Sequence, residues 1–464
     1  MVSARVAIVY PPLKSDKGVP LLTQNRQFQW FSRPTYVFPV VPATAATILK
    51  REGCEVLFLD GIAAELTETE FERRLADFRP DYVVMETKTP VVKRHWRWAA
   101  AHDYKVILVG DHVTALPEES MAKKGVWAVI PGGDWDFALK RFLEGDRHAG
   151  VYPFALEESI ADAPWIDREL VNWELYAKKN GNFRRTPGTY IMAGRDCWHG
   201  KCTFCSWTTL YPKYRVRKVA DVVDEIAMLV KKYGVKEIMD DSGSFPVGEW
   251  LKEFCELMIA RGLNKRVRID CNMRFGRLSA EDFSLMRKAG FRLVLFGVES
   301  ANEETLRRYK KAITVKDVED GAKWASEAGL EVHLTFMFGH AWEGREEMER
   351  TVALAHRLLA KGYASTLQCT LTVPYPGTPL FKELDAASAL ATKDWDEYDM
   401  RRAIAIAPRT NEAEIKRAIQ RVYRGFLQPR AIYHRIFSTR TVFDFSFYYR
   451  GVRSLVGHLR DFKV

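Results

Sequence analysis

The sequence predicts an α/β protein with a doubly wound, Rossmann-like sheet first, a partial, TIM-like β/α barrel second and a small, mainly helical segment last. Short β-branched runs alternate with stretches of helical period up to about residue 145, and the alternation restarts at Tyr190. Three cysteines follow the first strand of this second array. Such alternation is typical of parallel sheets covered by helices. We therefore expect domains at 1–150 and 186–395, a linker at 151–185 and a final segment at 396–464.

Length and composition set the class of protein. The 464 residues are 47% apolar and 28% charged, which is typical of a globular chain with more than one domain. No run approaches the roughly 18 apolar residues that a membrane-spanning helix needs, and no signal peptide opens the chain, so we expect a cytoplasmic protein. Cysteines outside the cluster stand singly in apolar surroundings and are expected to be reduced core residues: Cys54, Cys255, Cys271 and Cys369.

Charge is concentrated at the C-terminal end. From Arg401 onward 14 Lys and Arg face 4 Asp and Glu, a difference of +10 that equals the net charge of the whole chain. Such a segment suggests an anionic partner, whether substrate, nucleic acid or membrane surface. A solvated helical face is the equally weighted alternative.

The first array contains five expected strands and the helical stretches between them. The strands are 6–10, 56–59, 82–85, 106–109 and 127–130, and the helices include 43–51, 68–78 and 92–102. Ligands of doubly wound sheets bind beyond the carboxyl ends of the strands, where this sequence places Gly, Pro and small polar residues. The candidate ligand-binding residues there are Tyr10, Pro11, Asp60, Thr87, Thr89, Gly110, Asp111, His112, Gly133 and Asp134.

The second array contains six β/α units, which indicates a full or partial barrel with its chemistry at the carboxyl ends of the strands. The expected strands are 190–193, 237–239, 268–271, 293–298, 331–338 and 366–373. The expected helices are 219–233, 250–261, 280–289, 315–328 and 346–361. Beyond them, 412–464 mixes helical period with arginine and aromatic residues.

The densest chemical signal is Cys197-Trp-His-Gly-Lys-Cys202-Thr-Phe-Cys205. A short irregular loop of this kind can supply three thiolates to an iron–sulfur cluster and leave one iron open to a small molecule. A zinc site with His199 as fourth ligand is the main alternative, although zinc sites usually combine two separated ligand pairs. A disulfide cluster would require an oxidising compartment.

These residues resemble the radical S-adenosylmethionine (radical SAM) superfamily. The cysteine loop follows barrel strand 1 and has an aromatic residue, Phe204, before its last cysteine, and Phe296-Gly-Val-Glu-Ser300 and Pro374-Tyr-Pro-Gly-Thr-Pro379 are family-like strand ends. The first array resembles the cobalamin-binding domain of one branch. There Gly110-Asp-His-Val-Thr-Ala-Leu-Pro-Glu-Glu is similar to the element Gly-Gly-Pro-His-x-x-x-x-Pro-Glu, and Gly133-Asp-Trp-Asp resembles the Gly-Glu-type loop that follows it.

The sequence departs from the family pattern in two places. Four residues, rather than three, separate Cys197 from Cys202, and Gly200 could absorb the extra one. The cobalamin motif Asp-x-His-x-x-Gly is absent, because the second-strand loop reads Asp60-Gly-Ile-Ala-Ala. A histidine ligand to cobalt by that route is therefore not expected.

The resemblance implies a [4Fe-4S] cluster on Cys197, Cys202 and Cys205 that cleaves S-adenosylmethionine (SAM) to a 5′-deoxyadenosyl radical. It further implies cobalamin, bound at the first-array residues, and methyl transfer to an unactivated carbon or phosphorus of a small molecule. A cyclase or rearranging enzyme acting on a tetrapyrrole-like or lipid substrate is the alternative. A tRNA-modifying enzyme ranks below both, because cysteines for a second cluster are missing, and a non-catalytic zinc scaffold ranks last.

The resemblance also implies site residues and partners. Phe204 would pack near the adenine or belong to the core. Glu299 and Ser300 would meet the ribose, with an ion pair as the alternative for Glu299, and Arg274 would bind the SAM carboxylate. The remaining expected SAM contacts are Asp240, Asp241, Ser242, Asn272, Gly339 and Glu343. Ser242 could instead cap a helix.

His199 and Tyr375 are the candidate catalytic residues, and His112, His340 and Trp207 could also line the cavity. Expected partners are a small-molecule substrate and an electron donor such as flavodoxin or ferredoxin. Nucleic acid is not expected, and the basic C-terminal segment is a candidate for contact with a membrane surface. Substrate identity, and the choice between methyl transfer and cyclisation, follow no transferable sequence pattern.

Overall fold

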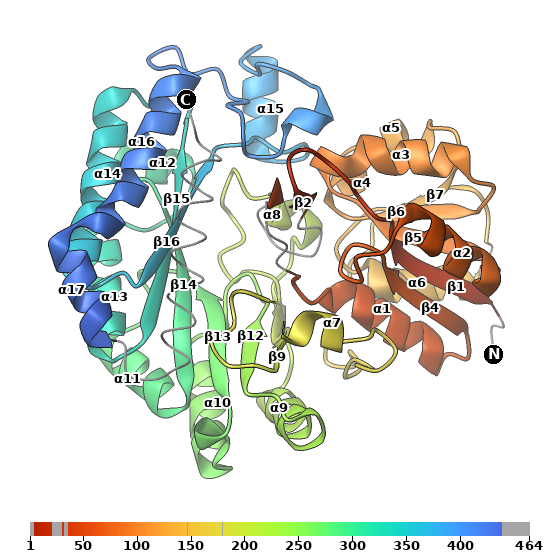
Figure 1. Cartoon of the computed structure of the whole chain (residues 1–464), viewed down its shortest axis with the longest axis horizontal. Coiled ribbons are helices and arrows are strands. Elements are labelled where there is room, and N and C mark those ends of the chain that lie inside the picture. Colours follow the sequence, from red (N-terminus) through yellow and green to blue (C-terminus); the bar gives the residue numbers. More distant parts are fainter. Residues whose placement is uncertain (1–3, 21–29, 32–35, 146, 179, 439–464) are drawn as a thin grey trace.

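The N-terminal half is built on one parallel sheet of six strands in the order β4-β1-β5-β6-β7-β8 (Figure 1). The computed structural model describes residues 4–20, 30–31, 36–145, 147–178 and 180–438. The strands are β1 (Arg5–Tyr10), β4 (Glu55–Asp60), β5 (Tyr82–Glu86), β6 (Val106–Val109), β7 (Val126–Ile130) and β8 (Gly150–Val151). Most of their β-branched side chains are buried, as a sheet covered on both faces requires.

Helices cover both faces of this sheet, so the predicted doubly wound architecture is confirmed. They are α1 (Val40–Arg51), α2 (Glu68–Phe78), α3 (Val92–Ala101), α4 (Asp111–Ala115), α5 (Pro117–Met121) and α6 (Trp135–Glu144). Strand β1 pairs with β4 on one side and β5 on the other. The chain therefore changes direction between β1 and β5, and ligands of such sheets bind in the crevice at that point.

The C-terminal half is built on a second sheet of six parallel strands, arranged in chain order. They are β9 (Gly188–Ile191), β12 (Glu237–Asp240), β13 (Arg268–Met273), β14 (Phe291–Glu299), β15 (Glu331–Phe338) and β16 (Thr366–Leu371). The main helices between and after them are α9 (Val219–Tyr233), α10 (Glu249–Ala260), α11 (Ala280–Lys288), α12 (Glu303–Arg308), α13 (Val315–Glu327), α14 (Arg345–Ala360) and α15 (Pro379–Ala386). Sequential order with helices outside confirms the predicted partial barrel.

Helix α9 illustrates why these segments fold as they do. Its apolar residues recur at helical spacing, so Val222, Ile226 and Leu229 lie on one buried face. Gly234 ends the helix in the left-handed conformation, with φ of +64°, which glycine adopts without strain.

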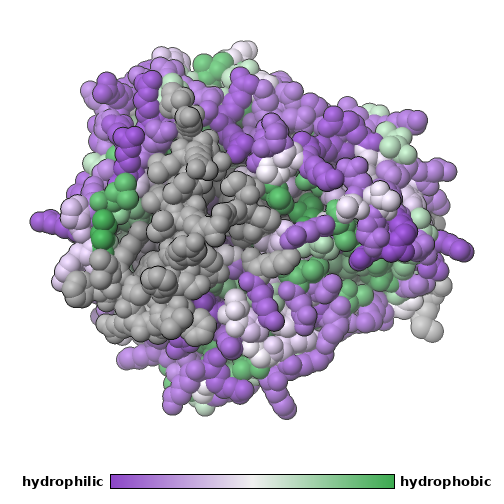
Figure 2. All heavy atoms as spheres, viewed as in Figure 1, coloured by the Kyte–Doolittle hydropathy of each residue, from purple (hydrophilic) through white to green (hydrophobic). Residues whose placement is uncertain are grey.

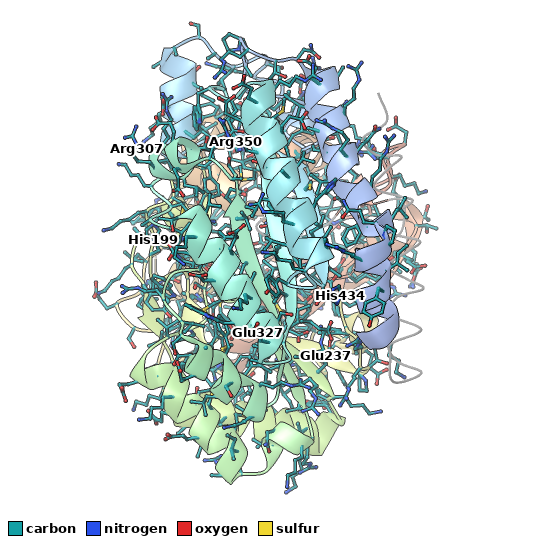
Figure 3. All side chains as sticks on the ribbon, turned by 90° about the vertical axis from the view of Figure 1, so that its left-hand side faces the viewer. His199, Glu237, Arg307, Glu327, Arg350 and His434 are labelled. Atoms are coloured by element: carbon teal, nitrogen blue, oxygen red, sulfur yellow. The ribbon has the colours of Figure 1, made fainter. Side chains whose placement is uncertain are left out.

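The amino end of the barrel is closed by buried charges. Arg292 is 5% exposed, and its guanidinium lies 2.5 Å from Asp270 Oδ2 and 3.1 Å from Glu237 Oε1. Glu331 Oε2 also lies 3.0 Å from Arg292 Nη1. Figure 3 shows Glu237, the first residue of β12, low in the barrel and His199 of the cysteine loop higher up. The barrel is therefore filled at one end, and its site lies at the other.

The segment between the halves is more ordered than a bare linker. It contains α7 (Glu174–Ala177), and its Arg168 is fully buried. The Arg168 guanidinium donates to Thr189 Oγ1 and to the Tyr190 carbonyl, both at 2.8 Å. The predicted linker therefore anchors the first barrel strand.

Residues 373–404 run back across the N-terminal half before the last helices. Val373, Tyr375, Trp395, Tyr398 and Met400 join the same apolar cluster as β1, β5 and β6. Lys93 of α3 pairs with Asp394 at 2.7 Å. The chain then enters α16 (Glu412–Arg424) and α17 (Pro429–Ser438), which pack on α14.

Shorter elements complete the fold. The small antiparallel pairs are β2 (Val19–Pro20) with β3 (Trp30–Phe31) and β10 (Gly194–Arg195) with β11 (Arg215–Val216). One-turn helices are α8 (Trp207–Leu210), η1 (Thr89–Val91), η2 (Leu263–Lys265), η3 (Trp395–Glu397) and η4 (Gly425–Leu427). Most of the face in Figure 2 is hydrophilic, and a group of hydrophobic residues lies near its centre, beside the residues drawn in grey.

No helix in the described part of the chain is both long and apolar enough to span a bilayer. The part of the predicted helical tail beyond residue 438 lies outside the described residues.

Candidate functional site at the junction of the two sheets

The cysteine loop leaves the carboxyl end of β9, as the sequence predicts. Of its three cysteines, Cys202 is buried, and Cys197 and Cys205 are half-buried. The loop backbone is held from outside, since Thr203 N donates to the Tyr309 carbonyl at 3.1 Å and Leu380 N to the Thr203 carbonyl at 2.9 Å. The three sulfurs are thus presented on a backbone with fixed partners.

The polar residues after β12 and β13 support this loop through its backbone. Asp240 Oδ2 accepts from Ala193 N, and Ser242 Oγ accepts from Gly194 N, both at 2.8 Å. Asn272 Nδ2 donates to the Ser242 carbonyl at 2.9 Å. Burial raises the pKa of Asp240 to about 6. Asp240, Ser242 and Asn272 therefore hold the start of the cysteine loop, and their role as SAM contacts stays a prediction, as does that of the buried Asp241.

Two cations lie against the buried cysteine. Arg274 Nη1 is 3.6 Å from Cys202 Sγ, and Arg274 Nη2 donates to the Lys311 carbonyl. Lys311 Nζ pairs with Glu299, which ends β14 with φ of +67°. Contact with the ribose and an ion pair were the two predicted roles of Glu299, and the structure contains the ion pair. Burial raises the pKa of the Cys202 thiol, and Lys311 and Arg274 oppose that rise.

Polar side chains that follow Glu299 form a hydrogen-bonded cluster. Ser300 Oγ donates to Glu343 Oε1 at 2.7 Å, and Thr305 Oγ1 donates to the same oxygen at 2.6 Å. Gly339 packs close to Ile415 of α16. His340 is fully buried, with Nδ1 2.6 Å from the Tyr309 hydroxyl. Ser300 and Glu343 are therefore hydrogen-bonded to each other, and His340 lies within hydrogen-bond distance of Tyr309.

Aromatic rings close one side of the cysteine loop. Phe204 lies 4.8 Å from Tyr309, centroid to centroid, and Lys311 Nζ is 5.7 Å from the Phe204 ring centre. No group of three or more His, Cys, Asp or Glu side chains among the described residues is placed to hold a single metal ion. The donor set fits a cluster better, because a cubane spreads its thiolate ligands over separate iron atoms.

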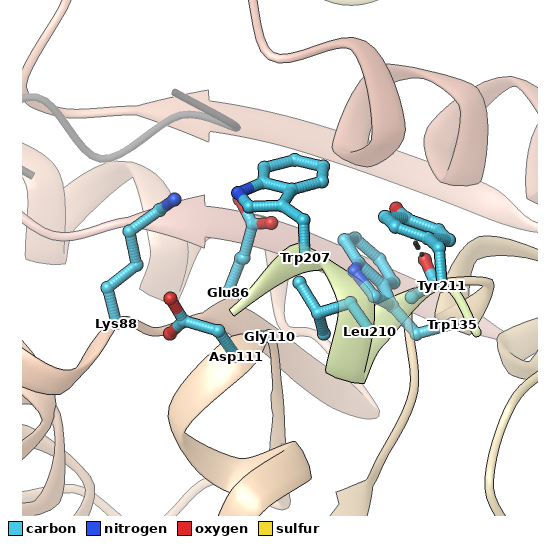
Figure 4. Close-up of a pocket in the computed structure, with 9 residues that line it drawn as sticks. Glu86, Lys88, Gly110, Asp111, Trp135, Trp207, Leu210 and Tyr211 are labelled. Atoms are coloured by element: carbon cyan, nitrogen blue, oxygen red, sulfur yellow. Dashed lines mark hydrogen bonds between the residues drawn. The ribbon is translucent and has the colours of Figure 1, made fainter. Parts of the chain in front are cut away.

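A small pocket lies between the carboxyl ends of the N-terminal strands and helix α8 (Figure 4). Glu86, Lys88, Gly110, Asp111, Gly133 and Trp135 line it from the N-terminal half, and Trp207, Leu210 and Tyr211 line it from the cysteine side. Tyr211 donates its hydroxyl hydrogen to the Gly133 carbonyl at 3.0 Å, as Figure 4 shows. Helix α8 starts two residues after Cys205, so the pocket adjoins the cysteine loop.

The chemistry of this pocket is aromatic with a few polar groups. Trp207 stacks on Tyr211 at 5.5 Å, and Lys88 Nζ is 5.9 Å from the Trp207 ring centre. Asp111 has one buried oxygen, Oδ1, without a hydrogen-bond partner. Burial raises the pKa of Asp111, and it raises that of Glu86 to about 7. An apolar cleft with few convergent polar groups is typical of a small-molecule site.

Glycines shape the pocket wall. At Gly133 a Cβ atom would lie 2.2 Å from the Tyr211 ring, and at Gly110, with φ of +109°, one would lie 2.4 Å from the Thr87 carbonyl oxygen. Only glycine therefore allows these two loops to approach α8 and β5 so closely.

Of the ten predicted ligand-binding residues, Gly110, Asp111 and Gly133 line the pocket. The other seven do not line it. Tyr10 donates its hydroxyl hydrogen to Glu86, and Asp60 Oδ2 accepts from Tyr176 at 2.7 Å. Thr87 is fully buried with no hydrogen-bond partner for its hydroxyl, and Pro11 is buried beside Tyr10.

His112 is fully buried away from the pocket lining. Its ring lies between Trp96 and Trp395, at 5.7 and 5.3 Å between centroids, and its Nδ1 is 3.2 Å from Thr89 Oγ1. Glu119 Oε2 is 3.5 Å from its other nitrogen. Tyr375 is also held, since its hydroxyl donates to the Tyr398 carbonyl at 3.0 Å.

Asp134 joins the two halves. Its carboxylate accepts from Arg195 Nη1 at 2.9 Å and pairs with Arg215, and Arg195 also pairs with Asp136. These groups are buried, and the arginines hold the pKa of Asp134 below its usual range despite that burial. The structure thus places Asp134 at the contact between the halves, beside Gly133 of the pocket.

Most of the pocket residues were not predicted from the sequence to bind a ligand. Trp207 was predicted only as a residue that could line the cavity, and Glu86 and Lys88 are the sequence neighbours of the predicted Thr87. The remaining missed residues are Trp135, Leu210 and Tyr211. Their position just after a strand-end loop or just after Cys205 is the one signal that could have found them.

Comparison with known proteins agrees with this arrangement. Residues 191–355 match the Radical SAM superfamily. An uncharacterized methyltransferase of Pyrococcus horikoshii is 26% identical over 421 residues, covering 83% of this chain and 87% of that protein. The anaerobic magnesium-protoporphyrin IX monomethyl ester cyclase of Cereibacter sphaeroides is 26% identical over 424 residues, covering 83% of this chain and 66% of its own length.

Among solved structures, the radical SAM methyltransferase TsrM of Kitasatospora setae, with cobalamin and a [4Fe-4S] cluster bound, superimposes with a TM-score of 0.68. The match covers 99% of both chains at 16% identity, so it shows a shared fold.

Proposed function

We propose that this chain, which carries a radical SAM domain, is a cobalamin-dependent methyltransferase that acts on an unactivated carbon or phosphorus of a small molecule. One observation carries the proposal. Helix α8, which begins two residues after Cys205, forms one wall of a pocket whose other wall is the set of N-terminal strand ends. Two cofactor sites would thus share a wall. Residues 1–150 would bind the cobalamin, and residues 186–395 would bind the cluster and SAM, with 151–185 as linker and 396–464 as C-terminal segment.

Cys197, Cys202 and Cys205 would hold the [4Fe-4S] cluster. When bound, the cluster and SAM supply a one-electron reductive cleavage, and cobalamin supplies the methyl group. Arg274 and Lys311 place positive charge beside Cys202. That charge would compensate the negative charge of a thiolate-ligated cluster.

The remaining residues would orient the cysteine loop and shield it from water. Asp240 and Ser242 fix the backbone at Ala193 and Gly194, where the cysteine loop begins. The ring pairs Phe204 with Tyr309 and Trp207 with Tyr211 would exclude water from the surroundings of the loop. A dry site strengthens electrostatic interactions and protects reactive species from solvent.

The pocket fits part of a corrinoid. Its aromatic walls offer flat apolar surface, and the unpartnered Asp111 oxygen offers an acceptor for an amide hydrogen. The pocket is too small for a whole corrinoid, so it would enclose only a portion of the macrocycle.

Anaerobic reconstitution tests the proposal. The protein, loaded with iron, sulfide and hydroxocobalamin and then desalted, should retain cobalamin and show the broad absorbance near ~400 nm that is typical of such clusters. With a reductant and SAM, we expect 5′-deoxyadenosine and, only when cobalamin is present, S-adenosylhomocysteine, which records departure of the methyl group. Stoichiometric zinc in place of iron, or failure to retain cobalamin, contradicts the proposal.

A cyclase is the second candidate, supported by the relative of that name that aligns with 83% of the chain. The same assay separates the two functions, because cyclisation without methyl transfer yields 5′-deoxyadenosine and no cobalamin-dependent S-adenosylhomocysteine.

We further propose that the enzyme is cytoplasmic and takes its electron from a flavodoxin- or ferredoxin-like donor. The singly placed, buried cysteines Cys255, Cys271 and Cys369 support a reducing compartment. The basic C-terminal segment, where exposed Arg424 and Arg430 flank exposed Leu427, supports contact with an anionic membrane surface. Sedimentation with anionic and neutral vesicles would test that contact.

A further inference from the structure

The cysteine loop is one residue longer between its first two cysteines than in the family pattern it resembles, and the structure shows where the additional length goes. Gly200 turns the loop with φ of +58°, and the half-buried Trp198 and His199 stand just before that turn. His199 Nε2 is 2.6 Å from the Lys310 carbonyl. His199 therefore anchors the loop to the segment after α12.

Trp198 lies against two arginines of the loop that follows β13. The guanidinium carbons of Arg274 and Arg277 are 5.3 and 5.5 Å from its ring centre. A cation within about 6 Å of an indole face is attracted by its quadrupole. Trp198 Nε1 is buried without a hydrogen-bond partner, so the ring is held by its faces and not by its polar atom.

Only one of those arginines reaches a cysteine. Arg274 is buried and extends Nη1 to within 3.6 Å of Cys202 Sγ, while its Nη2 donates to the Lys311 carbonyl. Arg277 is exposed. Arg274 is thus fixed by three contacts: an indole face, a backbone carbonyl and a sulfur.

We propose that Trp198 is a positioning residue that keeps the Arg274 guanidinium on the Cys202 sulfur and thereby raises the reduction potential of the cluster. The inference rests on the proposed function, because it requires Cys202 to be a cluster ligand. A donor to a ligating sulfur stabilises the reduced, more negative cluster and raises its potential. Removing the donor, or the ring that holds it, makes reduction harder.

The test is a redox titration, followed by electron paramagnetic resonance, of reconstituted full-length protein without SAM. Arg274→Gln should shift the midpoint downward, with a loss of about tenfold in the reduction equilibrium, ~59 mV for one electron. Trp198→Ala should shift it in the same direction, and Trp198→Phe, which keeps an aromatic face, should recover most of the change. Arg277→Gln, which contacts the same ring but no cysteine, is the matched control and should leave the midpoint in place.

Iron and sulfide content is measured on every variant, so the two proposals fail differently. Wild-type protein that takes up no cluster overturns both. Full clusters with unchanged midpoints in Arg274→Gln and Trp198→Ala overturn this inference alone. If Arg274→Gln instead weakens the spectral change on adding SAM while its midpoint stays fixed, Arg274 binds the SAM carboxylate and the inference is wrong.

Discussion

Arg195 and Asp136 form a buried ion pair across the junction of the two halves, with Nη2 2.5 Å from Oδ2. Arg195 stands two residues before Cys197, and Asp136 stands three residues after Gly133 of the pocket wall. The pair therefore joins the base of the cysteine loop to the loop that lines the proposed cobalamin site. Neither loop can shift far without breaking it.

Removal of the Asp136 carboxylate should lower the free energy of unfolding. Asp136→Ala leaves part of the Arg195 charge uncompensated in a buried setting, and we expect a loss of ~3 kcal/mol in the free energy of unfolding. Urea denaturation of the cofactor-free protein measures it. Glu158→Gln, which breaks a pair with Lys213 at the surface, is the control and should cause no measurable loss. Equal losses in the two variants would show that the buried pair has no special role.

Cysteine substitutions should separate cluster ligands from core residues. Alanine at Cys197, Cys202 or Cys205 should reduce bound iron and acid-labile sulfide to background after reconstitution, because each removes one of three thiolate ligands. Cys369→Ala, in the buried core of β16, should keep both. Full iron content in a variant of the loop would remove that residue from the ligand set.

A methyl group at Gly133 should disturb the shared wall. Gly133→Ala places a Cβ 2.2 Å from the Tyr211 ring, so α8 must move away. Overpacking of this kind costs ~1–3 kcal/mol, and we expect about tenfold weaker cobalamin retention, ~1.4 kcal/mol. Absorbance of bound hydroxocobalamin after desalting measures it. Gly145→Ala, where the nearest atom lies 3.3 Å away, is the control; a similar loss there would argue against the shared wall.

Glu86 should give the cofactor-free protein a distinctive pH dependence. Burial raises its pKa from 4.5 to about 7, so between these values the folded protein keeps a proton that the unfolded chain has lost. Stability therefore falls as the pH rises from 4.5 to 7 and then levels off. Glu86→Gln should remove a penalty of up to ~3 kcal/mol at pH 8 and change little at pH 4.5.

Urea titrations at both pH values check this sign. Glu158→Gln is again the control, because Lys213 lowers the pKa of Glu158 and so moves it away from this window. If the Glu86→Gln variant is only as stable as the wild type at pH 8, the Glu86 carboxyl has no raised pKa.

The architecture could be predicted because it depends on local patterns. The strands β6 and β15 and the helices α2 and α9 begin and end where the alternation of apolar residues predicts. The cysteine loop could be found for the same reason, since its three sulfurs lie within nine residues.

The roles of single charged residues could not be predicted, because their partners are distant in sequence. Asp134 belongs to a loop that resembles a ligand site, yet its carboxylate meets Arg195 and Arg215, 61 and 81 residues away. Glu299 meets Lys311 across a helix. The pocket itself required two segments, around Gly133 and around Tyr211, whose contact no local pattern records.

The return of residues 373–404 across the N-terminal half has a consequence for biosynthesis. One apolar face of the first sheet includes Val9 and Val83. It is covered by Tyr375, Trp395 and Tyr398, which leave the ribosome more than 290 residues after Val83. The first sheet therefore emerges early but keeps an apolar face open until the barrel has been synthesised, when chaperones would find it. Nascent chains arrested before residue 395 should accordingly bind a holding chaperone more strongly than chains arrested beyond residue 438.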